Sequence, residues 1–331
     1  MTKTTSNKNA AVVHQTMAQL MSREWPTPED VIGPWLKQGE SCFLWAATGA
    51  GKTMLSLTLA LLVAGGGEMA GWTAQKPRKV VYIDGEMRTA DLVERAKFLG
   101  DSIKGFDPDT AWANLEVHSR QDQRPEVEFY NICDPETQDA ICDHLRKSKA
   151  ELVILDNLTT LAKVVDENDS AAMGPLLDFM HKLKRDGIAA ILVHHGNKTG
   201  KAYRGSTAMV TTFEVVIGLV KPENATFEET VFSLTFEKFR GKRSEAIKPR
   251  VFSLDGSGWQ AKADDGDDVT RLLRAIETCE FTNQQEAGAS LKFDKTKTSK
   301  LLARAKKEGR ITAEQLKACF EAAFGDEDVP L

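Results

Sequence analysis

Residues 46–57, AATGAGKTMLSL, join a short apolar run, CFLW, to a leucine-rich segment with an amphipathic pattern. They fit the phosphate-binding loop G-x-x-x-x-G-K-[ST], except that Ala46 replaces glycine in the first position. Small residues let the backbone wrap a phosphate closely, and glycines adopt the positive φ angles that such a loop needs. N–H groups at the start of the following helix favour an anion. The stretch predicts a nucleotide site, against the alternative of a glycine-rich turn with a chance GKT.

The residues of this loop have distinct expected roles. Lys52 is expected to reach the β- and γ-phosphates of ATP, and the Thr53 hydroxyl to bind Mg²⁺. The predicted nucleotide-binding residues are Ala47, Thr48, Gly49, Ala50, Gly51, Lys52, Thr53 and Met54.

Composition limits the class of protein. The chain has 331 residues, 41% hydrophobic and 27% charged, which is typical of a soluble globular protein. Its net charge of −5 means that any nucleic-acid binding must come from local basic patches. The scattered cysteines show no CxxC spacing and indicate reduced thiols. Since no apolar run reaches the ~18 residues of a membrane span and no export signal is recognised, we expect a cytoplasmic protein without membrane contact.

The pattern of apolar runs predicts an α/β fold. Near-continuous apolar runs separated by helical segments are typical of a mostly parallel, twisted sheet covered on both faces. After residue 205, runs with short polar gaps predict an antiparallel extension. The predicted parallel strands are CFLWAA, VVYID, LEVHS, LVILD and AAILVHH, and the predicted helices are Thr53–Ala64, Ala90–Leu99, Thr137–Lys147 and Ala172–Lys184.

We predict three parts of the chain. Residues 1–27 read as a flexible arm with one short helix around Val12–Met21. Residues 28–262 form the predicted ATPase domain, and the acidic stretch KADDGDD links it to helical residues 263–331.

Two further strand ends carry carboxylates. LVILD ends in Asp156, which is expected to orient Mg²⁺ near Thr53; the alternative is a strand-capping aspartate. VVYIDGEM places Asp84 and Glu86 just after another strand, where ligands bind in open α/β sheets. A carboxylate there can polarise the water that attacks the γ-phosphate. We favour Glu86 as this base, with Asp84 and two solvated loop acids as alternatives.

The order of these motifs, followed by ILVHHGNKTGKAYRGST, resembles the RecA-like ATPase superfamily. The chain is most similar to the RepA group of plasmid and phage replicative helicases, related to the DnaB-type hexameric helicases. The resemblance spans residues 28–262. It implies a RecA-type core, ATP hydrolysis at subunit interfaces, and a ring or filament acting on DNA. It also places Glu86 at the position of the superfamily's catalytic glutamate.

The strand AAILVHH ends in two histidines, and one is expected to sense the γ-phosphate, as Gln or His does in the family. Alternation along the strand sends one ring toward the site and the other away. We favour His194 over His195. Metal binding by the pair is not expected, because no third ligand has suitable spacing.

The next loop, residues 196–206, is glycine-rich and basic. It fits contact with single-stranded DNA by phosphate neutralisation and base stacking, and it resembles the second channel loop of the RecA superfamily. The alternative is a solvated surface loop. The more acidic segment 161–170 is a weaker candidate for the first channel loop. The predicted nucleic-acid contacts are Lys198, Lys201, Tyr203 and Arg204.

Lys238 and Arg240, in EKFRGKR, resemble the paired Lys and Arg fingers of DnaB-type helicases, which enter the ATP site of the adjacent subunit. Such a cation neutralises charge on the transferring phosphoryl group. Arg204 is a rival for this role, and a basic strand edge that resists aggregation is the alternative.

The C-terminal residues have a helix-turn-helix rhythm, with predicted helices at Asn283–Leu291 and Lys297–Glu308, and resemble a winged-helix domain. Basic residues outnumber acidic ones between Lys292 and Arg310, as duplex binding requires. The alternative is a small helical cap that mediates assembly.

Together these observations predict an ATP- and Mg²⁺-dependent DNA motor, specifically a replicative helicase that assembles as a homo-oligomer, with a hexameric ring favoured. The alternatives are a recombinase or recombination mediator, and a nucleotide-switched regulator that binds duplex DNA.

Overall fold

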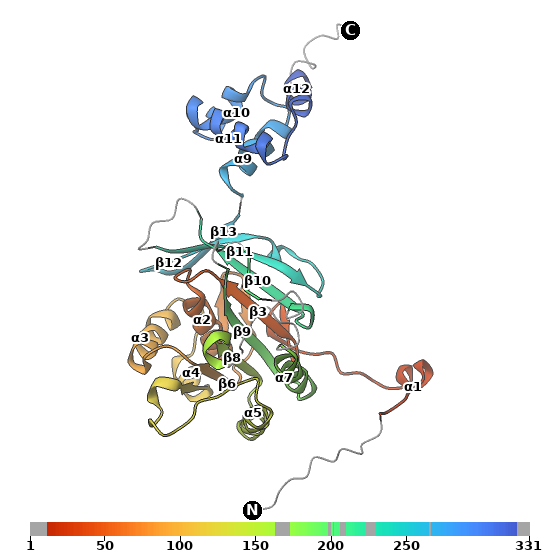
Figure 1. Cartoon of the computed structure of the whole chain (residues 1–331), viewed down its shortest axis with the longest axis vertical. Helices are drawn as coiled ribbons and strands as arrows, with labels where there is room; N and C mark the ends of the chain where they lie inside the picture. Colours follow the sequence, from red (N-terminus) through yellow and green to blue (C-terminus); the bar gives the residue numbers. More distant parts are fainter. Residues whose placement is uncertain are drawn as a thin grey trace, which may run out of the picture.

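The computed structural model describes residues 12–162, 173–197, 200, 202–205, 210–222, 229–264 and 266–322. Its centre is a nine-stranded sheet with strand order β13-β12-β11-β10-β3-β9-β8-β6-β7 (Figure 1). Strands β10 to β7 run parallel, whereas β11, β12 and β13 are antiparallel. The predicted α/β class is confirmed. The strands are β3 (Ser41–Ala46), β6 (Val80–Asp84), β7 (Leu115–Ser119), β8 (Leu152–Asp156), β9 (Ala189–His195), β10 (Val215–Val220), β11 (Thr230–Phe239), β12 (Arg250–Asp255) and β13 (Gly258–Ala263).

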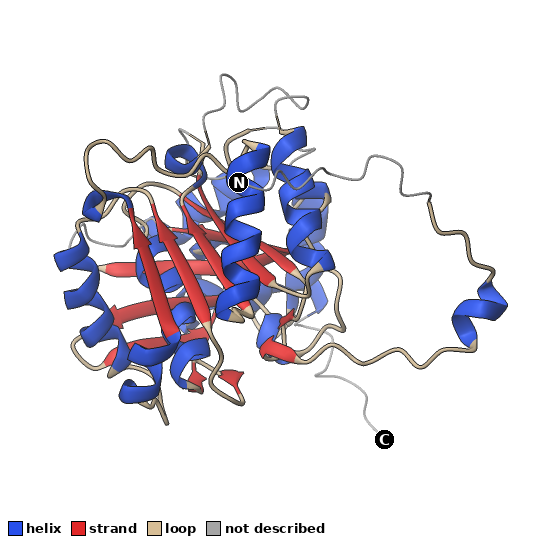
Figure 2. Ribbon diagram, turned by 90° about the horizontal axis from the view of Figure 1, so that it is seen from below, coloured by secondary structure: helices blue, strands red, loops and turns tan. Residues whose placement is uncertain are grey.

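Helices cover both faces of the sheet, as Figure 2 shows from below. Side chains alternate along each strand: Leu44 packs into one core cluster, and Phe43 and Trp45 pack into the other. Both faces are apolar because both are buried, as expected for parallel strands. The first cluster includes side chains of α2 (Lys52–Gly65) and α3 (Thr89–Gly100), and the second includes side chains of α5 (Pro135–Ser148), α6 (Leu158–Leu161) and α7 (Gly174–Arg185).

Helix α2 differs from its predicted amphipathic form. Almost all its side chains are buried, including Ser56 and Thr58, because it contacts α3, α4 (Pro108–Asn114) and the sheet. The sequence pattern also missed α4 and the small pairs β1 (Asp30–Ile32) with β2 (Leu36–Lys37) and β4 (Gly67–Met69) with β5 (Trp72–Ala74).

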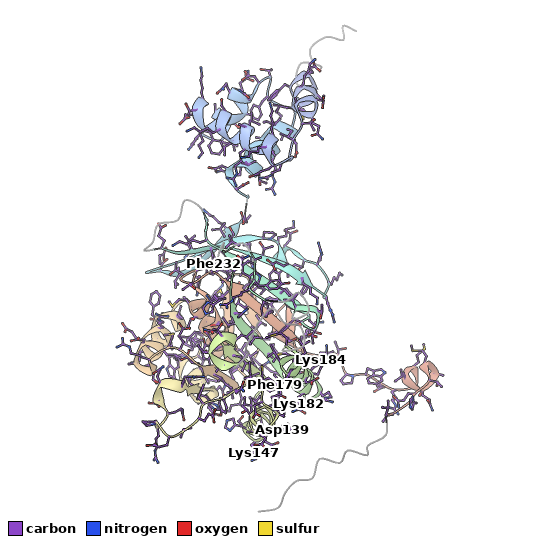
Figure 3. The ribbon with its side chains drawn as sticks, viewed as in Figure 1. Asp139, Lys147, Phe179, Lys182, Lys184 and Phe232 are labelled. Carbon is purple, nitrogen blue, oxygen red and sulfur yellow. The ribbon has the colours of Figure 1, made fainter. Side chains whose placement is uncertain are left out.

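The antiparallel strands pack against the phosphate loop and the helix that follows it. Phe232 of β11, labelled in Figure 3, is fully buried, and a Cβ atom at Gly51 would lie 3.2 Å from its ring. Trp259 of β13 donates a hydrogen bond to Thr58 of α2 (2.8 Å). The antiparallel extension therefore supports the phosphate loop from the side.

On the other face of the sheet, Lys182 of α7 pairs with Asp139 of α5 at 2.7 Å.

The C-terminal helices α9 (Asp268–Glu277), α10 (Gln284–Ser290), α11 (Lys295–Lys307) and α12 (Ala313–Ala322) form a cluster beyond β12 and β13 with its own apolar core (Figure 1). Helices α10 and α11 lie where the helix-turn-helix pattern predicts them. A Cβ atom at Gly288 would lie 2.1 Å from the Thr298 hydroxyl oxygen, so glycine is required where these two helices meet.

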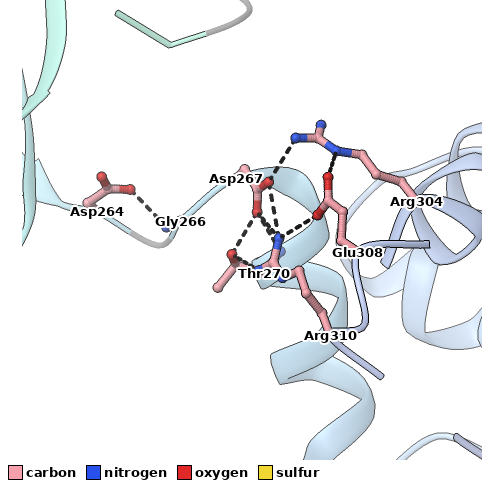
Figure 4. A network of polar contacts seen from close by, with 7 residues as sticks. All are labelled: Asp264, Gly266, Asp267, Thr270, Arg304, Glu308 and Arg310. Atoms are coloured by element: carbon pink, nitrogen blue, oxygen red, sulfur yellow. Dashed lines mark hydrogen bonds and ion pairs between the residues drawn. The ribbon is translucent and has the colours of Figure 1, made fainter. Parts of the chain in front are cut away.

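Polar contacts hold the start of this cluster together, as Figure 4 shows. Asp267 caps α9 by accepting a hydrogen bond from the Thr270 N–H (2.8 Å), and it pairs with Arg310 (3.3 Å) and Arg304 (3.6 Å). The predicted boundary near residue 263 falls at the end of β13.

Near the N-terminus, α1 (Met17–Met21) is shorter than the predicted helix and buries no side chain. Among the described residues, no helix has both the length and the apolar character needed to cross a membrane.

Candidate active site

A pocket opens at the carboxyl ends of the parallel strands, where ligands bind in open α/β sheets. The register pairs Ala46 with His195 and Asp84 with Asp156, so the tips of four strands lie together. The cavity volume is about 490 Å³. Its lining residues are Thr48, Gly49, Gly51, Lys52, Thr53, Met54, Asp84, Glu86, Met87, Arg95, Asp156, Asn157, His195 and Thr230.

The loop from β3 to α2 has the backbone that phosphate binding requires. Gly49 and Gly51 have φ angles of 76° and 98°, values that favour glycine. Gly51 leads directly into the 14-residue helix α2, whose first N–H groups have no partner within the helix. The loop therefore fits an anionic phosphate. Ala47 and Ala50 belong to the same loop but do not line the pocket.

Lys52 is the buried cation of this pocket. Its Nζ donates hydrogen bonds to the carbonyl oxygens of Ala46 (3.2 Å) and Ala47 (3.1 Å). Burial lowers the pKa of Lys52, while the charges of Asp156 and Glu86 act to raise it. The ammonium group is thus held beside the loop, with two acids of the pocket close enough to influence it.

Asp156 is fixed by hydroxyl groups at the end of β8. Its carboxylate accepts hydrogen bonds from Tyr82 (2.6 Å) and Ser56 (3.2 Å), and the Thr53 side chain is close enough to lower its pKa. Burial raises the pKa of Asp156, and these hydroxyl groups act to lower it. Thr53 and Asp156 place a hydroxyl and a carboxylate side by side, oxygen donors that suit Mg²⁺.

Asp84 and Glu86 occupy different positions in the loop after β6. Asp84 is buried and accepts hydrogen bonds from the backbone N–H groups of Glu86 (3.2 Å) and Met87 (2.8 Å), so it closes the turn. Glu86 extends into the pocket, where its carboxylate accepts a hydrogen bond from the Asn157 amide (2.7 Å). A Cβ atom at Gly85 would lie 2.1 Å from the Thr160 hydroxyl oxygen, which explains the glycine between the two acids.

Replacing Asp84 with asparagine is expected to remove a pH-dependent cost to folding. Burial raises the Asp84 pKa to about 6. This exceeds the usual value of about 3.9 for an unfolded chain. The wild type therefore loses stability as pH rises from about 4 to about 6, while Asp84→Asn keeps an acceptor for the two N–H groups without the charge. The stability gained by the variant should approach roughly 3 kcal/mol well above pH 6 and vanish below pH 4.

Urea unfolding of the nucleotide-free protein between pH 4.5 and 7.5 measures this difference. Asp101→Asn, at an exposed position after α3, is the matched control and should track the wild type. A loss of stability in Asp84→Asn that is equal at every pH contradicts the expectation.

The histidine assignment needs a correction. His195 lines the pocket, whereas His194 is fully buried on the opposite face of β9, where its ring packs near Phe43. The reason is alternation: Val193 and His195 share the face that carries α2. Burial lowers the pKa of His194 to about 4, and its Nε2 lies 3.0 Å from the Arg204 carbonyl oxygen.

Two of the predicted DNA contacts, Lys198 and Lys201, lie outside the described residues, as does most of the segment 161–170. Tyr203 is partly buried, and its ring packs edge-on against Phe43 (5.8 Å between ring centres) and Trp45 (6.4 Å). These contacts anchor this part of the loop to β3, and base stacking by Tyr203 stays a prediction.

Arg204 is exposed, and its backbone N–H donates a hydrogen bond to the His195 carbonyl oxygen (3.2 Å). Together with the contact between His194 and the Arg204 carbonyl, this bond ties the loop directly to the end of β9.

Lys238 and Arg240 lie far from the pocket of their own chain. The register pairs Lys238 with Val216 and aligns Val215 with Cys42, so both cations lie at the amino-terminal edge of the parallel strands. The pocket is at the opposite edge.

Within the chain, both cations bind the segment just before β10. Lys238 donates to the carbonyl oxygens of Val210 (2.9 Å) and Thr211 (2.7 Å), and Arg240 donates to Thr211 (2.9 Å). Arg240 also lies 3.6 Å from the Glu214 carboxylate.

Sequence reasoning missed four pocket residues, of which Met87 directly follows Glu86 in the loop after β6. Asn157 directly follows the strand-ending aspartate, and a polar residue at that position was a usable signal. Arg95 lies on α3 and Thr230 begins β11, so only packing brings them to the pocket.

Comparison with known proteins agrees with this geometry. Residues 7–201 match the AAA domain family AAA_25. The structure is similar to the crystal structure of the KaiC-like protein PH0186 from the hyperthermophilic archaeon Pyrococcus horikoshii OT3, with a TM-score of 0.51 and 19% sequence identity. The similarity covers 70% of this chain and 93% of the archaeal one, and it shows that the two share a fold.

Proposed function

The chain belongs to the AAA domain family AAA_25 and is a P-loop ATPase with a RecA- and KaiC-like fold. From this premise we propose that it is a DNA-dependent motor, specifically a replicative helicase of the RepA type. The observation that carries the proposal is the pocket, which gathers a phosphate loop, Lys52, Asp156 and Glu86 at adjoining strand ends.

These residues divide the work of ATP hydrolysis. The loop N–H groups and Lys52 bind the phosphates, and Thr53 with Asp156 would hold Mg²⁺. When bound, the metal neutralises phosphate charge. The Glu86 carboxylate accepts the proton of the attacking water, and the Asn157 amide orients that carboxylate.

The end of β9 offers a route from nucleotide to DNA. His195 lines the pocket, and its own carbonyl oxygen accepts the Arg204 N–H. A shift of the β9 tip in response to the γ-phosphate therefore moves the start of the loop formed by residues 196–206. We propose that this loop holds single-stranded DNA.

The placement of Lys238 and Arg240 supports assembly into a homo-oligomer. At the sheet edge opposite their own pocket, they are suited to reach the pocket of a neighbouring subunit. A hexameric ring repeats this contact at every interface and closes on itself.

Single-stranded DNA is expected to stimulate ATP hydrolysis, because binding at the loop reaches the pocket through β9. The assay compares hydrolysis without DNA, with a single-stranded oligonucleotide and with blunt duplex of equal length. Lys52→Ala controls for contaminating ATPases. Equal rates in all three conditions contradict a motor, and stimulation without strand separation on a forked substrate favours the recombinase.

A second candidate, a nucleotide-switched regulator that binds duplex DNA, is favoured by one observation. Helix α11 places the exposed Lys295, Lys300, Lys306 and Lys307 on a compact helical cluster. Duplex binding that responds to nucleotide, without stimulation by single strands, supports this candidate over the motor.

A further inference from the structure

A group of metal-binding side chains lies outside the ATP pocket, at the free edge of the sheet. Glu116 and His118 belong to the edge strand β7, and His144 belongs to α5. One potential ligand atom from each residue lies within 4.8 Å of the other two. None of these residues lines the pocket.

The strand geometry brings the three side chains together. Glu116 and His118 are two residues apart on β7 and therefore share a face. Their register partners Val81 and Ile83 belong to the core cluster that includes side chains of α5, so this is the face that meets His144.

The distances converge on one oxygen. The Glu116 Oε1 atom lies 2.8 Å from the His118 Nε2 atom and 2.7 Å from the His144 Nε2 atom. The two imidazole rings lie 4.9 Å apart between centres, tilted by 67°. A small cation could replace the two hydrogen-bonding contacts that Glu116 makes. Both nitrogen atoms and the carboxylate are already directed toward one point.

The donor set indicates the kind of ion. Two imidazoles and one carboxylate are typical zinc ligands, usually with a water in the fourth position. The Tyr130 hydroxyl lies 3.1 Å from the His118 Nδ1 atom and fixes that ring with its Nε2 toward the site, as outer partners of zinc-binding histidines do. Mg²⁺ is a poor fit, because it prefers oxygen ligands.

Solvent can reach the site. The side chains of Glu116 and His144 are 44% and 39% exposed, whereas His118 is 16% exposed. An ion can therefore enter without unfolding, and water can complete its coordination. We propose that Glu116, His118 and His144 bind one Zn²⁺ ion that links the edge strand β7 to helix α5.

Zinc titration of the full-length, tag-free protein tests the proposal. The protein is first stripped with a chelator and dialysed, and Mg²⁺ in excess occupies the ATP pocket. Calorimetry should report one Zn²⁺ per chain, and Co²⁺ should give the visible absorption of a tetrahedral site. Zinc should raise the melting temperature, because it binds the folded chain.

Variants separate this site from chance binding. Tyr130→Phe removes an outer partner and should weaken zinc affinity roughly 10–100-fold. His144→Ala removes a ligand and should weaken zinc affinity by more than that. His144→Cys should restore binding and shows that the position tolerates replacement. His181→Ala, at an exposed histidine of α7, is the matched control and should bind as the wild type does.

Two results overturn the proposal. One is the absence of stoichiometric zinc binding by the wild type, which would leave the cluster as an ion-pair network. The other is equal binding by the wild type, His144→Ala and His118→Ala. Neither result depends on ATPase activity.

Discussion

Glu86→Gln is expected to reduce the turnover rate of ATP hydrolysis about 10²–10⁴-fold while ATP binding persists. The glutamine keeps the size of the side chain and a partner for the Asn157 amide. It cannot accept the proton of the attacking water. Steady-state hydrolysis measured beside equilibrium binding of a fluorescent ATP analogue separates the two effects.

Glu94→Gln is the matched control, because Glu94 is an exposed acid on α3 outside the pocket. Normal hydrolysis by Glu86→Gln removes Glu86 from the catalytic role. A comparable loss in Asp84→Asn, with Glu86→Gln active, identifies Asp84 as the base, although its hydrogen bonds to two backbone N–H groups make this the less expected outcome.

Arg240→Ala is expected to have the second large effect, a loss of roughly 10³–10⁵ in turnover, typical of an arginine supplied from outside the site. The expectation rests on the proposed assembly, in which Arg240 neutralises phosphoryl charge in the neighbouring subunit. Lys238→Ala should act in the same direction. Nucleotide binding by the isolated chain should be unchanged, because both cations lie at the far edge of the sheet.

Mixing two inactive variants tests whether the cation acts between subunits. Arg240→Ala and Glu86→Gln subunits combined in equal amounts should regain part of the activity, since some interfaces join an intact pocket to an intact arginine. Arg243→Ala, in the same basic stretch, is the control. Wild-type turnover by Arg240→Ala contradicts the role, and an inactive mixture indicates that Arg240 acts within its own chain.

Arg240 also has a local structural contact that the experiment must separate. It binds the Thr211 carbonyl and lies near the Glu214 carboxylate. Thermal unfolding of the variant distinguishes a weakened fold from a missing cation, and Arg240→Lys should keep the charge while losing the forked geometry.

The fold could be predicted well because its signals are local. An apolar run such as LVILD indicates a strand that is buried on both faces, and the glycines around Lys52 predict a loop that wraps an anion. The strand order and the burial of α2 on nearly all sides were harder to predict from the sequence. Thr58 is buried although its residue type suggests exposure, because its hydroxyl donates to the Met54 carbonyl oxygen within α2 and accepts from Trp259 of β13.

The site was predicted where one strand end determines a residue's place, and missed where packing does. Asp156 and Glu86 follow from the strands that precede them. His195 required knowing which face of β9 carries α2, and Tyr203 required knowing that Trp45 lies beneath it.

By itself, the sequence determined a phosphate loop between strand and helix, carboxylates at two strand ends, and an α/β sheet, because each depends on neighbouring residues in the chain. Only the tertiary structure decided which histidine lines the pocket, which edge carries Lys238 and Arg240, and that His144 meets Glu116 and His118. The physical reason is that strand pairing and helix packing join segments far apart along the chain, and residue spacing holds no record of those contacts.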